Sequence, residues 1–293
     1  MGWTFSSDPD DFLRAAEPFL HRRPVENSIH LTVSAKLRRR GLTAYGPTPP
    51  AFGWWRPAEG GSVEAAFLHT PPLPPLLTRA PAAAARELAE QWPGRPPGGA
   101  RGDHEAVAAF AAAWTARTGQ RHHVAVRTRI HALGELTPRR PGPPGRHRVA
   151  DSADRALLLR WEQAARAELG DPLSGAADAV DDAIVGGLRT LWLTPDGTPV
   201  AMAGRTTEAA GSIRVVGVYT PPEHRGKGYA GGVVTAVSQA ALATGARHVL
   251  LVTDLANPVS NGLYHRLGYR PVRDGLHVAF TPGGARHDGT GPA

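Results

Sequence analysis

The segment Arg225–Ala230, with the sequence RGKGYA, has the composition of a loop that binds phosphate oxygens. It lies between a β-branched run, Ile213–Thr220, and a long stretch of small residues that predicts a helix. Glycines at 226 and 228 allow successive backbone N–H groups to turn toward one point, and the positive end of the helix dipole is directed to the same place. The sequence therefore predicts a site for an anion with several oxygens, such as a diphosphate.

Two other phosphate-binding motifs share these glycines. Gly226, Gly228 and Gly231 also spell GxGxxG, and Asp254 follows at a spacing compatible with a dinucleotide-binding acid. A dinucleotide fold needs its first glycine directly after the strand, whereas two prolines intervene here. A GxxxxGK[ST] loop does not fit, because Tyr229 follows Gly228 where that motif has lysine. The flanking residues thus disfavour an NAD(P)-binding oxidoreductase, which stays an alternative.

With its flanks, the segment VGVYTPPEHRGKGYAGG resembles the acyl-CoA loop of the GCN5-related N-acetyltransferase (GNAT) family. Arg225, Gly228 and Ala230 fill the family pattern [QR]xxGx[GA]. A second signature of the family follows in NPVSNGLYHRLGYRPV, and its matching residues are Asn257, Asn261, Tyr264, Gly268 and Tyr269. The two motifs occur in the family's order, so the chain from about 147 to 281 is similar to a GNAT domain.

The resemblance implies acetyl-CoA as co-substrate and a backbone-built site. The N–H of Val218 would polarise the thioester oxygen, and the main chain of the next two residues would pair with the pantetheine arm. The residues expected to bind acetyl-CoA are Val218, Tyr219, Thr220, Arg225, Gly226, Lys227, Gly228, Tyr229, Ala230 and Asn257. No metal site is expected, because the histidines show no HExxH or similar spacing.

Tyr264 is the candidate catalytic acid. A phenol is protonated at neutral pH and can stabilise or protonate the departing thiolate, although Tyr264 could also be an ordinary helix aromatic. It lies off the apolar stripe formed by Val259, Leu263 and Leu267. Asn257 would contact pantetheine or cap the helix that begins at Pro258.

The sequence assigns no general base. Histone-type members of the family often carry a glutamate four residues before the polarising amide, and Arg214 stands at that place here. This argues against lysine-protein acetylation. The carboxylates of Glu162, Glu208 and Asp254 could each reach the cleft, but none stands out, and water or an already neutral amine could suffice.

The resulting interpretation is an acetyl-CoA-dependent N-acetyltransferase. It would transfer the acetyl group to a primary amine of a small molecule or peptide by direct attack in a ternary complex. A non-catalytic acyl-CoA-binding sensor is a second alternative, because no base is evident.

The length of 293 residues suits two domains, and the breaker-rich segment Thr137–Gly145 lies near the middle. We expect an α/β (α+β) GNAT fold with a mixed, splayed sheet flanked by helices, repeated in tandem. The expected units are residues 1–140, a degenerate copy without its cofactor loop; 141–282, the catalytic domain; and 283–293, a flexible tail.

The expected elements of the second half are strands at 148–150, 188–193, 198–204, 213–220, 248–253, 270–272 and 277–280, with helices near 154–165, 229–244 and 258–267. In the first half, helices are expected at 24–40, 82–92 and 103–118, and strands at 52–55, 63–70, 76–78 and 122–131. Only Arg79–Pro81 separates the strand at 76–78 from the next helix, too short a connection for a diphosphate cradle.

Composition restricts the remaining classes. Without cysteine, disulfides and thiolate chemistry are excluded, and a cytoplasmic location is expected. The net charge is +7, but only Lys36 and Lys227 among 33 basic residues are lysines, which points to a bacterial coding bias. The cluster Lys36–Arg40 lacks interleaved aromatics, so no nucleic-acid partner is expected, and no membrane span or secretion signal is seen. The chain is expected to be a monomer with pseudo-dimeric halves or a homodimer.

Overall fold

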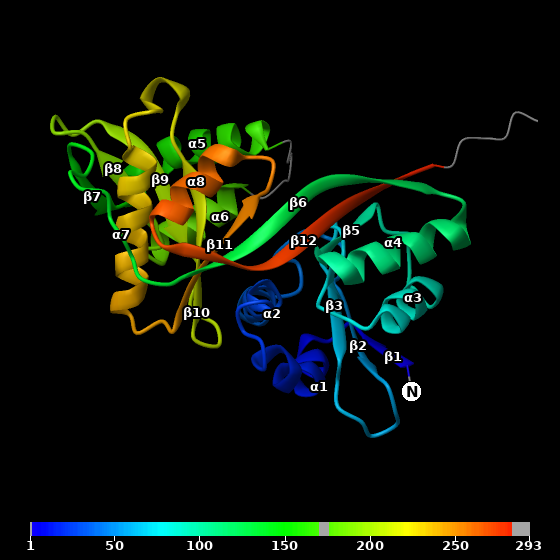
Figure 1. Cartoon of the computed structure of the whole chain (residues 1–293). Coiled ribbons are helices and arrows are strands. Elements are labelled where there is room, and N and C mark those ends of the chain that lie inside the picture. Colours follow the sequence, from blue (N-terminus) through cyan, green and yellow to red (C-terminus); the bar gives the residue numbers. More distant parts are fainter. Residues whose placement is uncertain (1, 170–175, 283–293) are drawn as a thin grey trace, which may run out of the picture.

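The computed structural model describes residues 2–169 and 176–282. The expected flexible tail lies outside the described residues. The two halves of the chain repeat one order of elements, each as one strand, two helices, three strands and then helix, strand, helix, strand (Figure 1). This repetition agrees with the prediction of a tandem chain.

The elements of the first half are β1 (Gly2–Ser6), α1 (Pro9–His21), α2 (Ser28–Arg40), β2 (Ala51–Arg56), β3 (Ala65–His69), β4 (Leu76–Leu77), α3 (Ala82–Glu90), β5 (Gly99–Asp103), α4 (His104–Thr118) and β6 (Arg121–Leu133). Those of the second half are β7 (Arg146–Val149), α5 (Arg155–Glu168), α6 (Ala176–Val185), β8 (Arg189–Leu193), β9 (Pro199–Arg205), β10 (Ser212–Tyr219), α7 (Tyr229–Ala243), β11 (His248–Asp254), α8 (Pro258–Arg266) and β12 (Tyr269–Thr281). Short 3₁₀ turns η1 (Ser152–Asp154) and η2 (Pro222–His224) precede α5 and the glycine loop.

The last strand of each half is exchanged with the other half. Within the described residues, twelve strands form one mixed sheet in the order β1-β2-β3-β4-β5-β12-β6-β11-β10-β9-β8-β7. Strand β12 pairs with β5 of the first half, and β6 pairs with β11 of the second. The two exchanged strands also pair with each other, and Figure 1 shows them as long ribbons joining the halves. Each half therefore completes the sheet of the other.

The exchange extends into the hydrophobic cores. Leu276 and Val278 of β12 belong to the cluster that contains Phe110 and Trp114 of α4. In return, Leu133 of β6 packs against the second-half core under α7. The two expected closing strands at 270–272 and 277–280 are thus one continuous strand, because it must span both halves.

Helices cover both faces of the sheet in the second half. Helices α7 and α8 pack on one face with a core that includes Val215, Val233 and Tyr269. Helices α5 and α6 pack on the other face with Leu191, Met202 and Tyr219. None of the helices within the described ranges combines the length and hydrophobicity needed to cross a bilayer.

Local signals predicted several element ends correctly. Gly245 follows α7 with φ +83°, and Gly197 closes the β8–β9 turn with φ +92°. Asn257 caps α8 through its side chain, which accepts a hydrogen bond from the Ser260 N–H at 3.1 Å, and Pro258 is the first helical residue. The sequence analysis missed β1, α1, β5 and α6, and it began α2 four residues too early, at Pro24 instead of Ser28.

Candidate functional site

Strands β10 and β11 separate beside the glycine loop. They pair in parallel only over Ser212–Arg214, which face His248–Leu250. Farther along, β11 continues to pair with β6, whereas β10 follows β9. Val252 remains 38% exposed although β11 is central, because the face toward which it points is uncovered there. The sheet is therefore splayed between β10 and β11, in agreement with the splayed sheet expected from the sequence.

A β-bulge in β10 marks this opening. The register with β9 shifts between Val216 and Tyr219, and Gly217 has φ +57°. Between the pairs Val216–Gly204 and Tyr219–Met202, two residues of β10, Gly217 and Val218, stand against a single residue of β9. A bulge of this kind redirects the main chain, so the Val218 amide lies outside the regular ladders.

Arg189 of β8 lies against the bulge, and the sequence analysis did not single it out. Its Nη2 donates to Glu162 Oε2 at 2.9 Å, and its Nη1 is 3.5 Å from the Val216 carbonyl oxygen. A Cβ on Gly217 would lie 2.8 Å from Arg189 Cζ. The sequence does contain a sign of this role. Arg189 alternates with Leu191 and Leu193 along the strand, so it stands at a position that faces the core, where a charged residue is unusual.

The loop after β10 presents backbone donors. Gly226 and Gly228 have φ of +77° and +87°, as a cradle requires. Hydrogen bonds within the loop use the amides of His224 and Arg225, whereas the N–H groups of Gly226, Lys227 and Gly228 donate to no acceptor in the described chain. Gly228 is also the N-cap of α7, so the free amides lie at the positive end of a fifteen-residue helix.

The side chain of Arg225 braces this loop. Its Nε donates to the Thr220 carbonyl oxygen at 2.9 Å, and its Nη2 donates to Glu168 of α5 at 2.6 Å. The backbone N–H of Arg225 already donates to Pro222. Arg225 therefore fixes the loop, and Tyr229 anchors it by inserting its ring into the core under α7.

The connection between the halves lies over the loop. A Cβ on Gly228 would be 3.3 Å from Arg139 Nη1, and a Cβ on Gly232 would be 2.8 Å from Pro143 Cγ. Trp192 ties this connection down by donating its indole N–H to the Pro144 carbonyl at 3.0 Å. Gly232 therefore lets the first turn of α7 lie directly against this connection. Arg139, an exposed cation, lies beside the free amides.

Tyr264 is the buried residue of α8, at 8% exposure. Its ring contacts Tyr269 edge-on at 6.1 Å, and burial raises its pKa. The Tyr269 hydroxyl is hydrogen-bonded to Ser238 at 2.7 Å, whereas the Tyr264 hydroxyl has no partner in the described chain. The expected stripe on this helix was wrong, because Val259 is 79% exposed and Tyr264 faces the core.

Asparagines hold the start of α8. Asn257 caps the helix, which is one of its two predicted uses. Asn261 donates from Nδ2 to the Asp254 carbonyl at 3.0 Å and so ties the end of β11 to α8, while its Oδ1 is buried without a partner.

The three carboxylates considered as bases are all engaged. Glu162 bonds to Arg189 and Arg166, Glu208 accepts from the Gly211 N–H, and Asp254 accepts from the Ala256 N–H. Within the described residues, no group of three or more acidic, histidine or cysteine side chains could hold a metal ion. The arrangement thus offers hydrogen-bond donors and cations rather than a base.

The first half lacks an equivalent loop. Strand β4 pairs in parallel with β5 over two residues, which corresponds to the β10–β11 pair. Beyond β4, Thr78 accepts from the Ala66 N–H and donates back to its carbonyl, and α3 begins directly after Pro81. The corresponding main chain is therefore closed onto β3.

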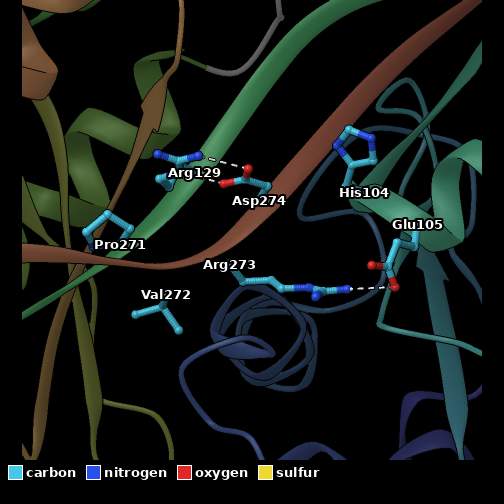
Figure 2. Close-up of a pocket in the computed structure, with 7 residues that line it drawn as sticks. All are labelled: His104, Glu105, Arg129, Pro271, Val272, Arg273 and Asp274. Carbon is cyan, nitrogen blue, oxygen red and sulfur yellow. Dashed lines mark hydrogen bonds and ion pairs between the residues drawn. The ribbon is translucent and has the colours of Figure 1, made fainter.

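A hollow of about 470 Å³ lies on the exchanged strands near the start of α4. Figure 2 shows Arg129 and Asp274 facing each other across β6 and β12, with Arg273 reaching toward Glu105. Its charged side chains are therefore paired with one another. None of the predicted site residues lines it.

The chain is similar to known proteins in its fold and in part of its sequence. A family model described as FR47-like protein matches residues 194–278. A GCN5-related N-acetyltransferase from Sphaerobacter thermophilus has a TM-score of 0.60 and 15% identity, with 95% of each chain covered. An acetyltransferase of the GNAT family from Colwellia psychrerythraea has a TM-score of 0.58 and 11% identity, covering 96% of this chain and 99% of that one.

A tandem GNAT protein from the clavulanic acid biosynthesis pathway aligns over 99% of both chains, with a TM-score of 0.53 and 14% identity. No curated protein sequence matches the chain. At these identities the structural likeness establishes the fold, and the fold is that of the GNAT acetyltransferases. The resemblance predicted from the sequence is confirmed at the level of the fold: the chain has a tandem GNAT-type fold, and residues 194–278 match the FR47-like model.

Proposed function

We propose that this chain is an acetyl-CoA-dependent N-acetyltransferase that acts on a primary amine of a small molecule or peptide. The observation that carries this proposal is the set of unpaired amides of Gly226–Gly228 at the start of α7, beside a separated pair of strands. Backbone donors at a helix N-terminus bind phosphate oxygens, and an open strand edge can pair with an amide-containing arm.

The residues fit acetyl-CoA along one path. The diphosphate would accept hydrogen bonds from the Gly226–Gly228 amides, and Arg139 would add a positive charge. The pantetheine amides would follow the main chain of Val218–Thr220. Acetyl-CoA supplies the acetyl group as an activated thioester, whose sulfur would lie near the unpaired hydroxyl of Tyr264.

In the reaction, the Val218 N–H would polarise the thioester oxygen. Tyr264 would donate a hydrogen bond to the departing sulfur. Because burial raises the pKa of Tyr264, while a thiol has a pKa of about 8.5, the hydroxyl would stabilise the thiolate without giving up its proton. Because the three carboxylates considered as bases are engaged, the amine would attack in its neutral form or lose its proton to water.

Calorimetric titration of acetyl-CoA and of NADH tests this proposal. We expect saturable binding of acetyl-CoA alone, together with release of free thiol when an amine is added. Gly228→Trp should abolish acetyl-CoA binding because the new side chain would fill the loop and collide with Arg139.

Gly60→Trp is the matched control, since Gly60 also has a positive φ but lies in the turn between β2 and β3 with open space around it. Undiminished acetyl-CoA affinity in a folded Gly228→Trp variant would refute the assignment of the loop. Binding of acetyl-CoA without thiol release for any amine would support a sensor instead of an enzyme.

A further inference from the structure

The side chain of Arg189 crosses a neighbouring strand to reach the bulge of β10. Arg189 is paired with Gly204 of β9, and a Cβ on Gly204 would lie 2.7 Å from Arg189 Nη1 and 3.0 Å from its Cδ. Gly204 has no positive φ, so a glycine is needed there for space and not for conformation. The guanidinium then ends against Gly217, where a Cβ would lie 2.8 Å from Arg189 Cζ. Gly204 and Gly217 thus form a glycine socket for Arg189.

Glu162 of α5 holds the guanidinium in this glycine socket. Its Oε2 accepts a hydrogen bond from Arg189 Nη2 at 2.9 Å, and its Oε1 accepts one from Arg166 Nε at 3.2 Å. The side chains of Arg189 and Glu162 are only 8% and 13% exposed. A buried ion pair seldom stabilises a fold more than apolar residues of similar size would. Stability therefore does not by itself explain why a charged pair occupies this place.

The guanidinium lies against the peptide unit that is proposed to polarise the thioester. The Val218 N–H belongs to the peptide unit that begins at Gly217, so its direction depends on the conformation of Gly217, with φ +57°. Arg189 contacts Gly217 from the face that α5 and α6 cover, and its Nη1 lies 3.5 Å from the carbonyl oxygen of Val216. Donors to a developing oxyanion act only when they are held in the productive direction. A shift of Arg189 would therefore turn the Val218 N–H.

Helix α5 also supports the loop of free amides, through a second carboxylate. Glu168 accepts from Arg225 Nη2 at 2.6 Å, and it follows Glu162 by six residues, which is about 9 Å along a helix. The Glu168–Arg225 pair is exposed to solvent, so it should contribute less than the buried pair. One helix thus supports two parts of the proposed site, the Val218 amide through Glu162 and the loop through Glu168.

We propose that Arg189 and Glu162 are positioning residues for the acetyl transfer. Glu162 holds Arg189 in the glycine socket, and Arg189 holds Gly217 so that the Val218 N–H points into the opening between β10 and β11. The inference rests on the proposed function and adds two residues to it. It also gives Glu162, which was considered as a base, a different role, because both of its oxygens accept from guanidinium groups.

Kinetics of thiol release together with calorimetry separate positioning from cofactor binding. The double variant Glu162→Gln with Arg189→Met leaves no buried carboxylate without its partner. It should lower kcat by about tenfold or more, while the Kd for acetyl-CoA stays within about twofold. Arg189→Lys should retain part of the activity, because it keeps a cation for Glu162. Glu168→Gln should do the reverse and raise the Kd by up to about fivefold, with kcat within about twofold.

Arg148→Met is the matched control for a loss of stability alone. Arg148 forms a comparable pair with Asp154 at the start of α5, but it lies on β7, at the edge of the sheet and away from the bulge. This variant should unfold at lower urea concentration than the wild type while its kcat stays within about twofold.

The pH dependence of kcat/KM distinguishes positioning by Glu162 from base catalysis. The single variant Glu162→Gln keeps an oxygen that accepts from Arg189, so the profile should keep its shape. Loss of the acidic limb of the profile in this variant would show that Glu162 is the base, and it would overturn the role proposed here.

Infrared spectroscopy of bound acetyl-CoA, labelled with ¹³C at the carbonyl, reports the Val218 amide without turnover. A hydrogen bond from Val218 N–H lowers the carbonyl stretching frequency. We expect the full lowering in the wild type and Arg148→Met and a smaller one in the double variant, or in Arg189→Lys if the double variant does not fold. Equal frequencies and equal kcat in a folded Arg189 variant would overturn this inference and leave the proposed function intact. Failure of the wild type to bind acetyl-CoA would overturn both.

Discussion

Gly217→Ala is the substitution that tests most directly how β10 positions the Val218 amide. Two costs can be separated. An alanine at φ +57° loses about 1–2 kcal/mol because its Cβ crowds the backbone. Its Cβ would also lie 2.8 Å from Arg189 Cζ and 3.0 Å from Arg189 Nη2. Moving this buried guanidinium would break its bond to Glu162, at about 1–3 kcal/mol.

We therefore expect Gly217→Ala to lower the free energy of unfolding by about 2–5 kcal/mol in urea denaturation. Gly245→Ala is the matched control, because Gly245 has φ +83° but no atom within 4 Å of a new Cβ. It should lose only the backbone term, about 1–2 kcal/mol. Adding Arg189→Met to Gly217→Ala should recover part of the difference between the two alanine variants.

The same substitution should impair acetyl transfer. If the bulge flattens, the Val218 N–H leaves its place, and loss of one such donor lowers kcat by about 100-fold or more. The rate of thiol release with a saturating amine that the wild type acetylates gives kcat, and calorimetry gives the Kd for acetyl-CoA. A stability loss no larger than that of Gly245→Ala would refute the packing of Arg189 under the bulge. Unchanged kcat in a destabilised Gly217→Ala variant would refute the role assigned to Val218.

Three further predictions address Tyr264, the connection between the halves and the buried histidines. Tyr264→Phe should lower kcat at least tenfold with little change in the Kd for acetyl-CoA, because it removes only the hydroxyl that we propose to face the leaving sulfur. Equal kcat would eliminate this role. Arg139→Gln should raise the Kd for acetyl-CoA about fivefold at low salt and less at high salt, while Arg140→Gln serves as the neighbouring control. Burial lowers the pKa of His30 to about 3 and that of His69 to about 4, so the unfolded chain takes up protons first as the pH falls below about 6.5. The stability that these two neutral histidines contribute is complete above that pH, and it should decline toward pH 4 by up to about 1.4 kcal/mol per pH unit for each histidine. Urea denaturation across this pH range should show a shallower decline of the free energy of unfolding in His30→Gln. An unchanged slope in that variant would contradict the burial of His30 in its neutral form.

Local chemistry explains which parts of the fold were predictable. The turn at Gly197, the end of α7 at Gly245 and the cap at Asn257 depend on residues a few positions apart, so their signals are contained in short segments. Helix α6 was missed although it lies in the second half, whose other elements were largely predicted. The strand predicted at 122–131 is present as β6, but its pairing with β11 was not predicted, because pairing between distant strands leaves no local signature.

The candidate site likewise contains parts that local sequence predicted and parts that only the packing of distant segments produced. Glycines that permit positive φ and the helix after them defined the loop, and the structure places its free amides there. Arg189 under the bulge, Arg139 over the loop and Arg214 against α2 come from segments remote in sequence. Their roles depend on which elements pack together.

The sequence by itself determined the positive-φ turn of the glycine loop and the place of the helix tyrosine, since each rests on residue type and short spacing, and the order of its predicted elements indicated the repetition of one fold. Only the tertiary structure decided that β6 and β12 exchange halves, that a linker arginine lies at the loop, and that Arg214 of β10 donates to Thr32 of α2. The physical reason is that sheet pairing and burial of charge are properties of the assembled chain. A residue's neighbours across the sheet are set by the packing of both halves together.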